Sequence, residues 1–150
     1  MKRCLISVSD KTGVQEFAQT LHRLGWELIS TGGTYKHLQD ASIPVKKVSA
    51  MTDQEEILSG RVKTLHPKIH GAILHDRHNA EHLADLERWN IGAIDMVVVN
   101  LYPFQASAID KGLSPKESIE WIDVGGPTML RASAKNLSLI HISEPTRLQQ

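Results

Sequence analysis

The segment CLISVSDKTGVQEFAQTLHRLGWELISTGGT, residues 4–34, indicates the fold of this chain. It begins with an apolar run at residues 4–8, which is typical of a strand buried on both faces of a sheet. A helix is predicted next, with Ser9 or Asp10 as its cap. Its apolar positions recur at helical spacing: Val14, Phe17, Ala18, Leu21 and Leu24. Residues 26–30 then predict a second strand, and a glycine turn follows it at once.

The alternation of strands and helices continues along the rest of the chain. The glycine turn leads into a helix that carries Tyr35 and Leu38, and residues 45–48 predict a short third strand. Residues 49–60 are polar and predict a loop with a turn of helix at residues 55–58. Helices are predicted at residues 80–89, 115–121 and 125–134, and the clearest strand lies at residues 94–99. This order predicts a three-layer α/β fold, with a mostly parallel sheet and helices on both faces.

The composition excludes several classes of protein. The 150 residues include 17 basic and 17 acidic side chains, and aromatic content is only 5%, which argues against a nucleic-acid-binding surface. A hydrophobic content of 41% is enough for the core of one domain. The single cysteine, Cys4, cannot form an internal disulfide, and no segment resembles a signal peptide or a membrane span. We therefore expect one soluble, cytoplasmic domain without nucleic-acid or membrane partners.

A basic stretch at residues 61–71, RVKTLHPKIHG, predicts an anionic ligand. Fixed cations are costly inside a fold unless an anion balances them. Short glycine turns of the kind that bind phosphate lie upstream, at Gly32 and Gly33, and downstream, at Gly125 and Gly126. Ligands of open α/β sheets bind beyond the carboxyl ends of the strands, so we expect these segments to meet at one edge. Three of the cations could instead be solvated surface charges: Lys11, Arg61 and Lys63.

The histidines of this stretch raise the question of a metal site. His66 and His70 lie four residues apart, but Pro67 disfavours a helical conformation at His66, which makes His66 a helix cap and separates the pair. There is no HExxH arrangement and no cysteine cluster. We therefore expect no metal and assign these histidines hydrogen-bonding roles.

The last predicted helix carries a further group of charged residues. Asp123 precedes the second glycine turn, and Arg131 and Lys135 stand four apart on one face of the helix. These residues could form a cap followed by a solvated basic face. Alternatively, a carboxylate and an amine enter the same pocket, where each shifts the pKa of the other so that the two can act as general acid and general base.

Five blocks of this sequence resemble, in order, the N-terminal inosine monophosphate (IMP) cyclohydrolase domain of the bifunctional transformylase/cyclohydrolase family of purine biosynthesis. The blocks are SVSDKTG (7–13), STGGT (30–34), GRVKTLHPKIHG (60–71), DMVVVNLYPF (95–104) and IDVGGPTMLRASAKN (122–136). The resemblance implies a methylglyoxal-synthase-like fold. It also implies a cofactor-free ring closure, in which the formylated aminoimidazole carboxamide ribonucleotide (FAICAR) gives IMP and water. The family further implies a small-molecule nucleotide substrate and a homodimer of the full-length protein.

The resemblance also implies which residues form the site. Lys135 would act as proton donor and acceptor, Lys63 and Asp123 would form a proton-handling pair, and Tyr102 would donate a hydrogen bond to the formyl oxygen. The glycine turn would take the phosphate, and Asn100 would contact the base or its carboxamide. The implied substrate-binding residues are Ser9, Asp10, Lys11, Thr31, Gly32, Gly33, Thr34, Arg61, Val62, Thr64, Asn100, Val124 and Gly125.

Two other functions are possible for a protein with this fold. A regulatory module that only binds a nucleotide or phosphate, or methylglyoxal synthase, would share the architecture, so only the site distinguishes them.

The end of the chain departs from the family. Residues 137–150, LSLIHISEPTRLQQ, do not resemble the family, which continues into a transformylase domain. We expect a cyclohydrolase domain at residues 1–136, a substitute edge strand within residues 137–142, and disorder at residues 143–150. Transformylase activity is not expected.

Overall fold

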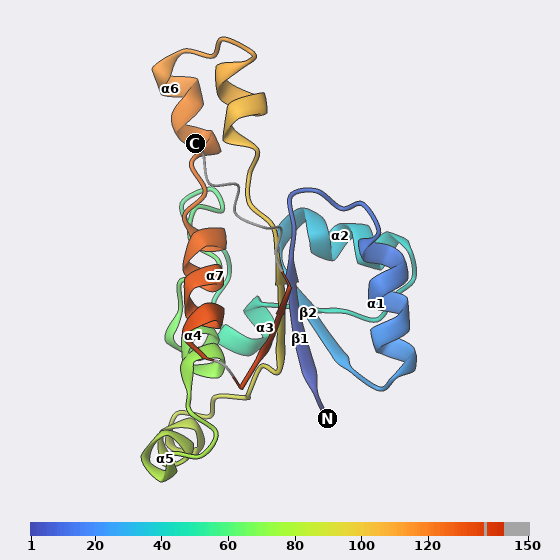
Figure 1. The fold of residues 1–150 in the computed structure, drawn as a ribbon, viewed down its shortest axis with the longest axis vertical. Helices are drawn as coiled ribbons and strands as arrows, with labels where there is room; N and C mark the ends of the chain where they lie inside the picture. The colour runs from blue at the N-terminus through green and yellow to red at the C-terminus, as the bar shows by residue number, and fades with distance from the viewer. Residues whose placement is uncertain (137, 143–150) are drawn as a thin grey trace.

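A five-stranded sheet, with strand order β3-β2-β1-β4-β5, forms the centre of the protein in the computed structural model, which describes residues 1–136 and 138–142 (Figure 1). All of the strand pairings are parallel. The strands are β1 (Arg3–Ser7), β2 (Glu27–Ser30), β3 (Lys46–Lys47), β4 (Met96–Val99) and β5 (Ile140–Ile142). This sheet confirms the predicted α/β class.

Helices cover both faces of the sheet, which gives the three layers expected from the sequence. Helices α1 (Val14–Arg23) and α2 (Gly32–Asp40) lie on one face, and α4 (Pro67–Leu74) and α7 (Gly125–Lys135) lie on the other (Figure 1). The remaining helical segments are α3 (Ser49–Thr52), α5 (Ala80–Arg88), the π-helix η1 (Gln105–Ile109), α6 (Pro115–Ser118) and the 3-10 helix η2 (Ile119–Trp121).

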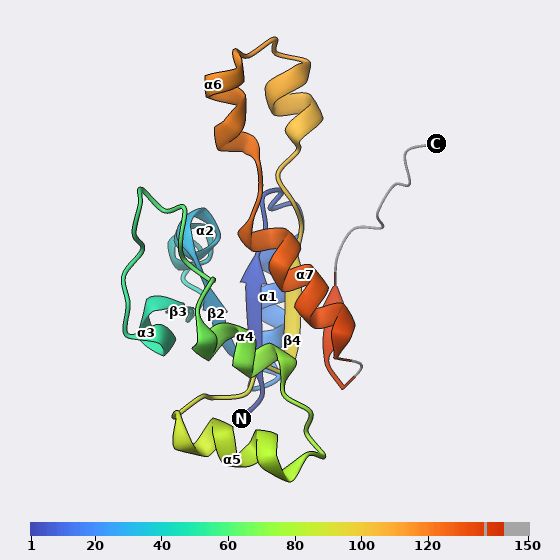
Figure 2. The ribbon, with the colours of Figure 1, turned by 90° about the vertical axis from the view of Figure 1, so that its left-hand side faces the viewer.

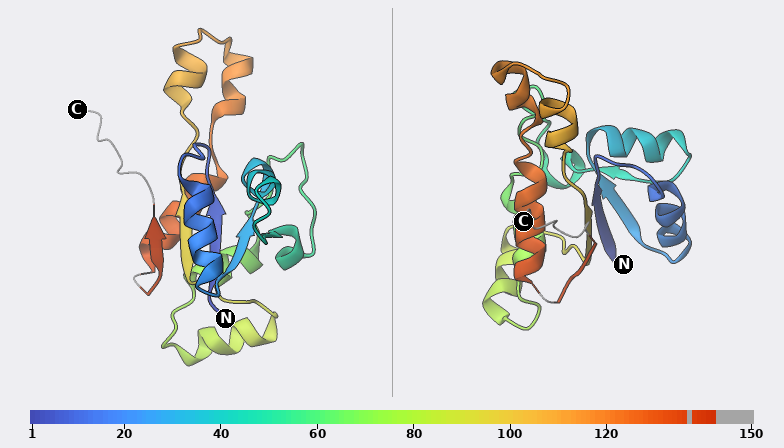
Figure 3. Two further views of the ribbon diagram at one scale, coloured as in Figure 1. Left: turned by 90° about the vertical axis from the view of Figure 1, so that its right-hand side faces the viewer. Right: turned by 45° about the horizontal axis from the view of Figure 1, so that its top comes forward.

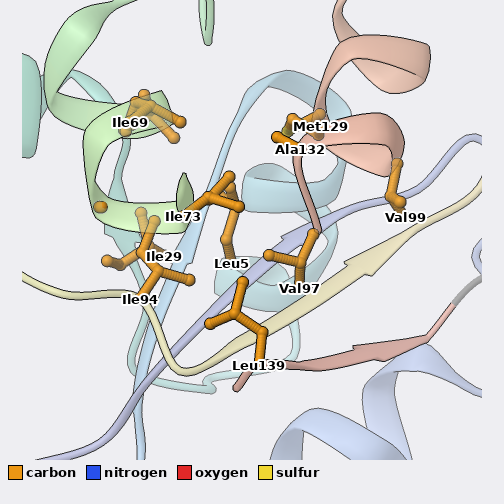
Figure 4. Packing of buried hydrophobic residues seen from close by; sticks show 12 residues of the cluster. Leu5, Ile29, Ile69, Ile73, Ile94, Val97, Val99, Met129, Ala132 and Leu139 are labelled. Carbon is orange, nitrogen blue, oxygen red and sulfur yellow. The ribbon is translucent and has the colours of Figure 1, made fainter. Parts of the chain in front are cut away.

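The side chains of β1 alternate between two hydrophobic clusters, one on each face of the sheet. Leu5 packs with Ile69 of α4 and Met129 of α7, as Figure 4 shows. Cys4 and Ile6 face the opposite way and pack against α1 and α2. Burial raises the pKa of the Cys4 thiol to about 12, so this side chain stays protonated and serves as part of the core. The apolar run at residues 4–8 therefore predicted a doubly buried strand correctly.

The beginning of α1 differs from the prediction, and its end at Gly25 agrees with it. The residue before the helix is Gly13, with a φ of 75°, and no side chain caps it, so neither Ser9 nor Asp10 is the cap. Asp10 instead accepts a hydrogen bond from the backbone amide of Thr12 at 2.9 Å. At the other end Gly25 adopts a φ of 82° and stops the helix, which leaves Leu24 69% exposed outside the buried face.

The helical turn expected at residues 55–58 is also wrong. The chain forms its turn of helix earlier, as α3, and Ile57 makes an isolated antiparallel bridge with Val62. Leu58, Ser59 and Gly60 have φ values of 54°, 56° and 83°. Three successive left-handed residues cannot continue a right-handed helix, so they turn the chain back on itself.

A histidine and an asparagine hold the two ends of α4. His66 is the N-cap, as predicted, and its side chain accepts a hydrogen bond from the amide of Lys68 at 3.1 Å. At the other end the side-chain amide of Asn136 donates to the carbonyls of Ile73 and His75, both at 2.8 Å. These bonds satisfy carbonyls that the end of a helix leaves free.

The described residues provide neither a cluster of metal ligands nor a membrane-spanning helix. No group of three or more His, Cys, Asp or Glu side chains in residues 1–136 and 138–142 is placed to hold a metal ion. Within the same ranges, every helix is too short or too polar to cross a membrane.

Strand β5 supplies the fifth strand of the sheet. Ile140–Ile142 pairs with Met96–Val98 of β4, so a strand does form within residues 137–142, as predicted. The disorder expected at residues 143–150 lies outside the described residues.

An arm projects beyond the carboxyl ends of the strands (Figures 2 and 3). We define the arm as residues 101–122, which leave β4, form η1, α6 and η2, and return to α7. Tyr102 and Trp121 close its base through a T-shaped contact, with ring centroids 6.2 Å apart at an angle of 76°. The sequence predicted only the helical part at residues 115–121.

Candidate active site

A cavity of about 560 Å³ opens at the carboxyl edge of the sheet. This volume is in the usual range for small-molecule sites, and the position is the one expected for ligands of parallel α/β sheets. Its wall is formed by the loops after β1, β2 and β4, by residues 59–65, and by the base of the arm with the start of α7. The structure therefore brings together the segments that the strand order was expected to gather.

Most of the predicted site residues line this cavity. The lining contains Ser9, Lys11, Thr31, Gly32, Gly33, Thr34, Arg61, Lys63, Thr64, Asn100, Tyr102, Asp123, Val124 and Gly125. The exceptions are Asp10, Val62 and Lys135. Asp10 is close in sequence to the lining but exposed, and hydrogen bonds, chiefly from the Thr12 amide, hold its pKa below the usual value. Val62 is turned into the bridge with Ile57.

The glycine turn after β2 lies beneath two lysine ammonium groups. Gly32 begins α2 with a φ of 48°, and Lys63 Nζ lies 3.0 Å from the point that a Cβ on Gly32 would occupy. Lys11 Nζ lies 3.6 Å from the corresponding point at Gly33. Because glycine has no side chain, nothing at these two positions stands between the backbone amides at the start of the helix and the two ammonium groups. A helix N-terminus with two lysines is suited to an anion such as phosphate.

The side chain of Asn100 organises the loop after β1. Its Oδ1 accepts from the amides of Ser9 at 2.5 Å and Asp10 at 3.1 Å, while its Nδ2 donates to the carbonyl of Asp10 at 2.8 Å. Lys11 follows in the same loop, with its Nζ 3.2 Å from the Ser9 carbonyl. Asn100 therefore positions main chain at the cavity, a role that the sequence did not indicate.

Asp123 joins the base of the arm to the start of α7. Its Oδ1 accepts from the amide of Gly126 at 2.8 Å, and its Oδ2 accepts from the amide of Tyr102 at 3.1 Å. A carboxylate at this position is favoured by the dipole of the helix. Lys63 lines the same cavity, but in the described chain its ion pair is with Glu56, at 3.8 Å, and not with Asp123. The proton-handling pair implied by the resemblance is thus gathered in one cavity without direct contact.

Lys135 lies away from this cavity. It is the last residue of α7, ten residues after Gly125, and an α-helix of that length rises about 15 Å. It lines a second hollow of about 770 Å³, together with His70 and Arg131. Leu65 is shared by the two walls. The structure therefore brings Lys63, Tyr102 and Asp123 together and leaves Lys135 outside.

The cavity also contains residues that sequence reasoning missed. Glu120 lines its mouth and pairs with Arg61 across 59 positions of sequence. An apolar part of the wall comes from Leu65, Ile119, Ile122 and Met129. Nothing in the local pattern pointed to Glu120, because its segment indicates only an exposed helix. The GRVKTL block placed Arg61 in the site but could not reveal its partner.

Comparisons with known proteins agree with this architecture. The MGS-like domain family matches residues 13–128. The bifunctional purine biosynthesis protein PurH of Staphylococcus haemolyticus (strain JCSC1435) is 57% identical over 136 residues, which are 91% of this chain and 28% of that protein. PurH of Neisseria meningitidis serogroup A is 58% identical over 136 residues, 91% of this chain and 26% of that protein. The chain thus spans less than a third of the length of these relatives.

A solved structure extends the likeness to three dimensions. The crystal structure of ForH superposes with a TM-score of 0.83 at 36% sequence identity, and the match covers 97% of this chain and 73% of that one. The parallel sheet, the cavity at its carboxyl edge and these matches lead to one assignment. The chain belongs to the MGS-like domain family.

Proposed function

We propose that this domain closes the purine ring of FAICAR to give IMP and water, as the cyclohydrolase part of purine biosynthesis. The observation that carries the proposal is the convergence of Lys63, Tyr102 and Asp123 with the Gly32–Gly33 turn in one cavity. The similarity to proteins named bifunctional purine biosynthesis protein PurH supports the choice of reaction. The proposal concerns ring closure alone.

The binding part of the proposal places the phosphate of the nucleotide at the start of α2. There the amides of the glycine turn and the ammonium groups of Lys11 and Lys63 would all meet it. The base would then extend toward the apolar wall, which contains Ile122 and Met129. Such an arrangement leaves the reacting carboxamide and formyl groups near the arm base, where Tyr102 and Asp123 lie.

The chemical part needs one new carbon–nitrogen bond that closes the ring, one carbon–nitrogen double bond, and the loss of one water. The carboxamide nitrogen attacks the formyl carbon, and the formyl oxygen takes a proton as the nitrogen loses one. The resulting hydroxyl then takes a second proton and leaves as water, while the nitrogen of the former formamide loses its proton and forms a double bond to the same carbon. Holding both groups in one folded conformation lowers the barrier to such an intramolecular step. We assign Tyr102 as the hydrogen-bond donor to the formyl oxygen, and Lys63 and Asp123 as the groups that exchange protons.

Lys135 enters this proposal only through a second copy of the chain. The resemblance makes it the proton donor and acceptor, yet within one chain it ends α7 on the far side from the cavity. A homodimer, which the resemblance also implies, would have to bring Lys135 of one copy to the cavity of the other. No cofactor or metal is needed for the steps assigned here.

The test is formation of IMP from FAICAR by the purified chain, without folate or added metal. We expect turnover that falls at least a hundredfold in Asp123→Asn while the chain stays folded by circular dichroism. Binding of IMP without turnover would instead indicate a regulatory binding module. Conversion of a triose phosphate to methylglyoxal, with no IMP formed, would indicate the synthase.

A further inference from the structure

Two of the three cations in the cavity wall already have a carboxylate partner. Arg61 Nη2 pairs with Glu120 Oε1, and Lys63 Nζ lies 3.8 Å from Glu56 Oε2. Lys11, by contrast, contacts the carbonyls of Val8 and Ser9, and no carboxylate of the described chain lies within 4.0 Å of its Nζ. An incoming anion would therefore meet a Lys11 ammonium group that has no carboxylate partner, but it would have to compete with Glu120 for Arg61.

The pair between Arg61 and Glu120 joins two separate segments of the cavity wall. Arg61 stands in the loop that turns at residues 58–60, and Glu120 stands in η2 of the arm, and both line the cavity. Their side chains keep exposed fractions of 61% and 59%. Exposed pairs of this kind contribute little to stability, and an ion with two charges can displace them.

The loop that carries Arg61 is itself held in an unusual conformation. Leu58 and Ser59 have positive φ angles of 54° and 56°, which are uncommon for residues with a side chain. Leu58 is also 68% exposed, so burial of its side chain does not hold the loop in this shape. The loop is held by backbone hydrogen bonds, from Gly60 to Ile57, from Arg61 to Leu58 and between Ile57 and Val62, and by the ion pairs to Glu56 and Glu120. Release of Arg61 from Glu120 would thus remove the contact that joins this loop to the arm.

We propose that Glu120 is a specificity-determining counter-ion, which holds Arg61 at the cavity wall in the free protein. The phosphate of a phosphate monoester ligand, bound at the start of α2 by Lys11 and Lys63, then replaces Glu120 as the partner of Arg61, which lines the same cavity. Glu120 then opposes binding of any anion that reaches Arg61, and it leaves uncharged ligands unaffected. The inference rests on the proposed function in one respect, the presence of a nucleotide in this cavity. It requires binding and not turnover.

The test measures dissociation constants by calorimetry for IMP and for inosine, which lacks the phosphate. Glu120→Gln should tighten IMP binding about twofold to fivefold, the range expected for loss of an exposed pair, and leave inosine unchanged. In an Arg61→Gln background the same change should have no effect, because the two residues form one coupled pair. Glu87→Gln on the distant helix α5 makes the same change of net charge and serves as the control.

Four outcomes decide the inference. An equal effect on inosine, an effect that persists without Arg61, or weaker IMP binding in Glu120→Gln would each overturn it. If the wild-type chain binds no IMP, inorganic phosphate is titrated in its place, and an unchanged phosphate affinity in Glu120→Gln would likewise overturn it. If IMP binds as described but FAICAR is not converted, the counter-ion role stands while the proposed reaction fails.

Discussion

Asn100 and Asp10 are joined by a two-way hydrogen-bonded contact. The Asn100 side chain donates to the Asp10 carbonyl at 2.8 Å and accepts from the Asp10 amide at 3.1 Å. The Asn100 side chain thus makes the same pair of hydrogen bonds, one donated and one accepted, that a backbone residue makes to its partner in a neighbouring antiparallel strand. The residue that follows β4 thereby fixes the loop that follows β1, and with it the place of Lys11.

Removing this contact should weaken nucleotide binding more than it weakens the fold. Asn100→Ala loses three hydrogen bonds to a part-exposed loop, each contributing about 0.5–1.5 kcal/mol. We expect the dissociation constant for IMP to rise about tenfold or more, while the melting temperature falls by only a few degrees. Calorimetry and thermal unfolding measure the two quantities. Unchanged IMP affinity would show that the loop keeps its shape without Asn100.

Gly126 leaves room for the Asp123 carboxylate. A Cβ at this position would lie 2.6 Å from Asp123 Oδ2 and 2.8 Å from Leu101 Cδ2, so Gly126→Ala must displace the carboxylate. We expect kcat for ring closure to fall at least tenfold. The matched control is Gly112→Ala, which strains a residue with a φ of 62° in the outer arm and meets no atom within 4 Å. Equal loss of activity in both variants would mean that lowered stability, and not the carboxylate, is the cause.

The two lysines that the resemblance assigns to catalysis should behave differently when each is removed. Lys63 lies over the glycine turn, whereas Lys135 lines the second hollow. We expect Lys63→Ala to lower kcat/KM at least a hundredfold, because it removes a charge from the cavity, and Lys135→Ala to lower it less than tenfold. Steady-state kinetics on both variants measures this. A hundredfold loss of kcat in Lys135→Ala, with KM intact, would instead show that this lysine reaches a cavity, as it could from a second copy.

His70 should make the fold sensitive to mild acid. Burial lowers the pKa of His70 below its ordinary value of 6.5, and its buried Nε2 has no hydrogen-bond partner in the described chain. The unfolded chain therefore binds a proton near pH 6.5 that the folded chain does not. The free energy of unfolding is unaffected well above that pH and falls as the pH drops from 6.5 toward the folded pKa.

Urea unfolding at pH 7.5 and pH 5.5 measures this effect. His70→Gln should lose stability less steeply between the two values than the wild type does. Replacement of the exposed His22 by glutamine is the control and should leave the pH dependence as it is. A wild-type stability that rises on acidification would contradict the assignment.

The sequence predicted the sheet and most of the cavity wall for identifiable reasons. Residues 4–8 are apolar apart from Ser7, and a short run of this kind is typical of a doubly buried strand. Once the strands are parallel, the loops after them must meet at one edge, so Lys11, Gly32 and Asn100 could be expected together. Side-chain partners were beyond reach, because the contact of Asn100 with Asp10 depends on distances of a few tenths of an ångström.

The positions of Lys135 and Glu120 relative to the cavity could not be predicted from the sequence pattern. Lys135 belongs to the same sequence block as Gly125, but an eleven-residue helix carries its two ends to opposite edges of the sheet. The length of the helix was available from the sequence, and the direction in which α7 crosses the sheet was not. Glu120 reaches the cavity only because the arm folds back to its own base. This is a feature of the tertiary structure, and the periodicity of the local sequence gives no information about it.

The arm has a consequence for how such a domain can change. It leaves and rejoins the fold at one point, where Tyr102 meets Trp121 and Asp123 accepts from the Tyr102 amide. Among the described residues, those at 105–118 contribute nothing to the cavity wall. Insertions, deletions or a grafted recognition module in that outer part would leave the chemistry at its base in place. The arm is thus a place where evolution or an engineer can add a new property to the domain at little cost to the old one.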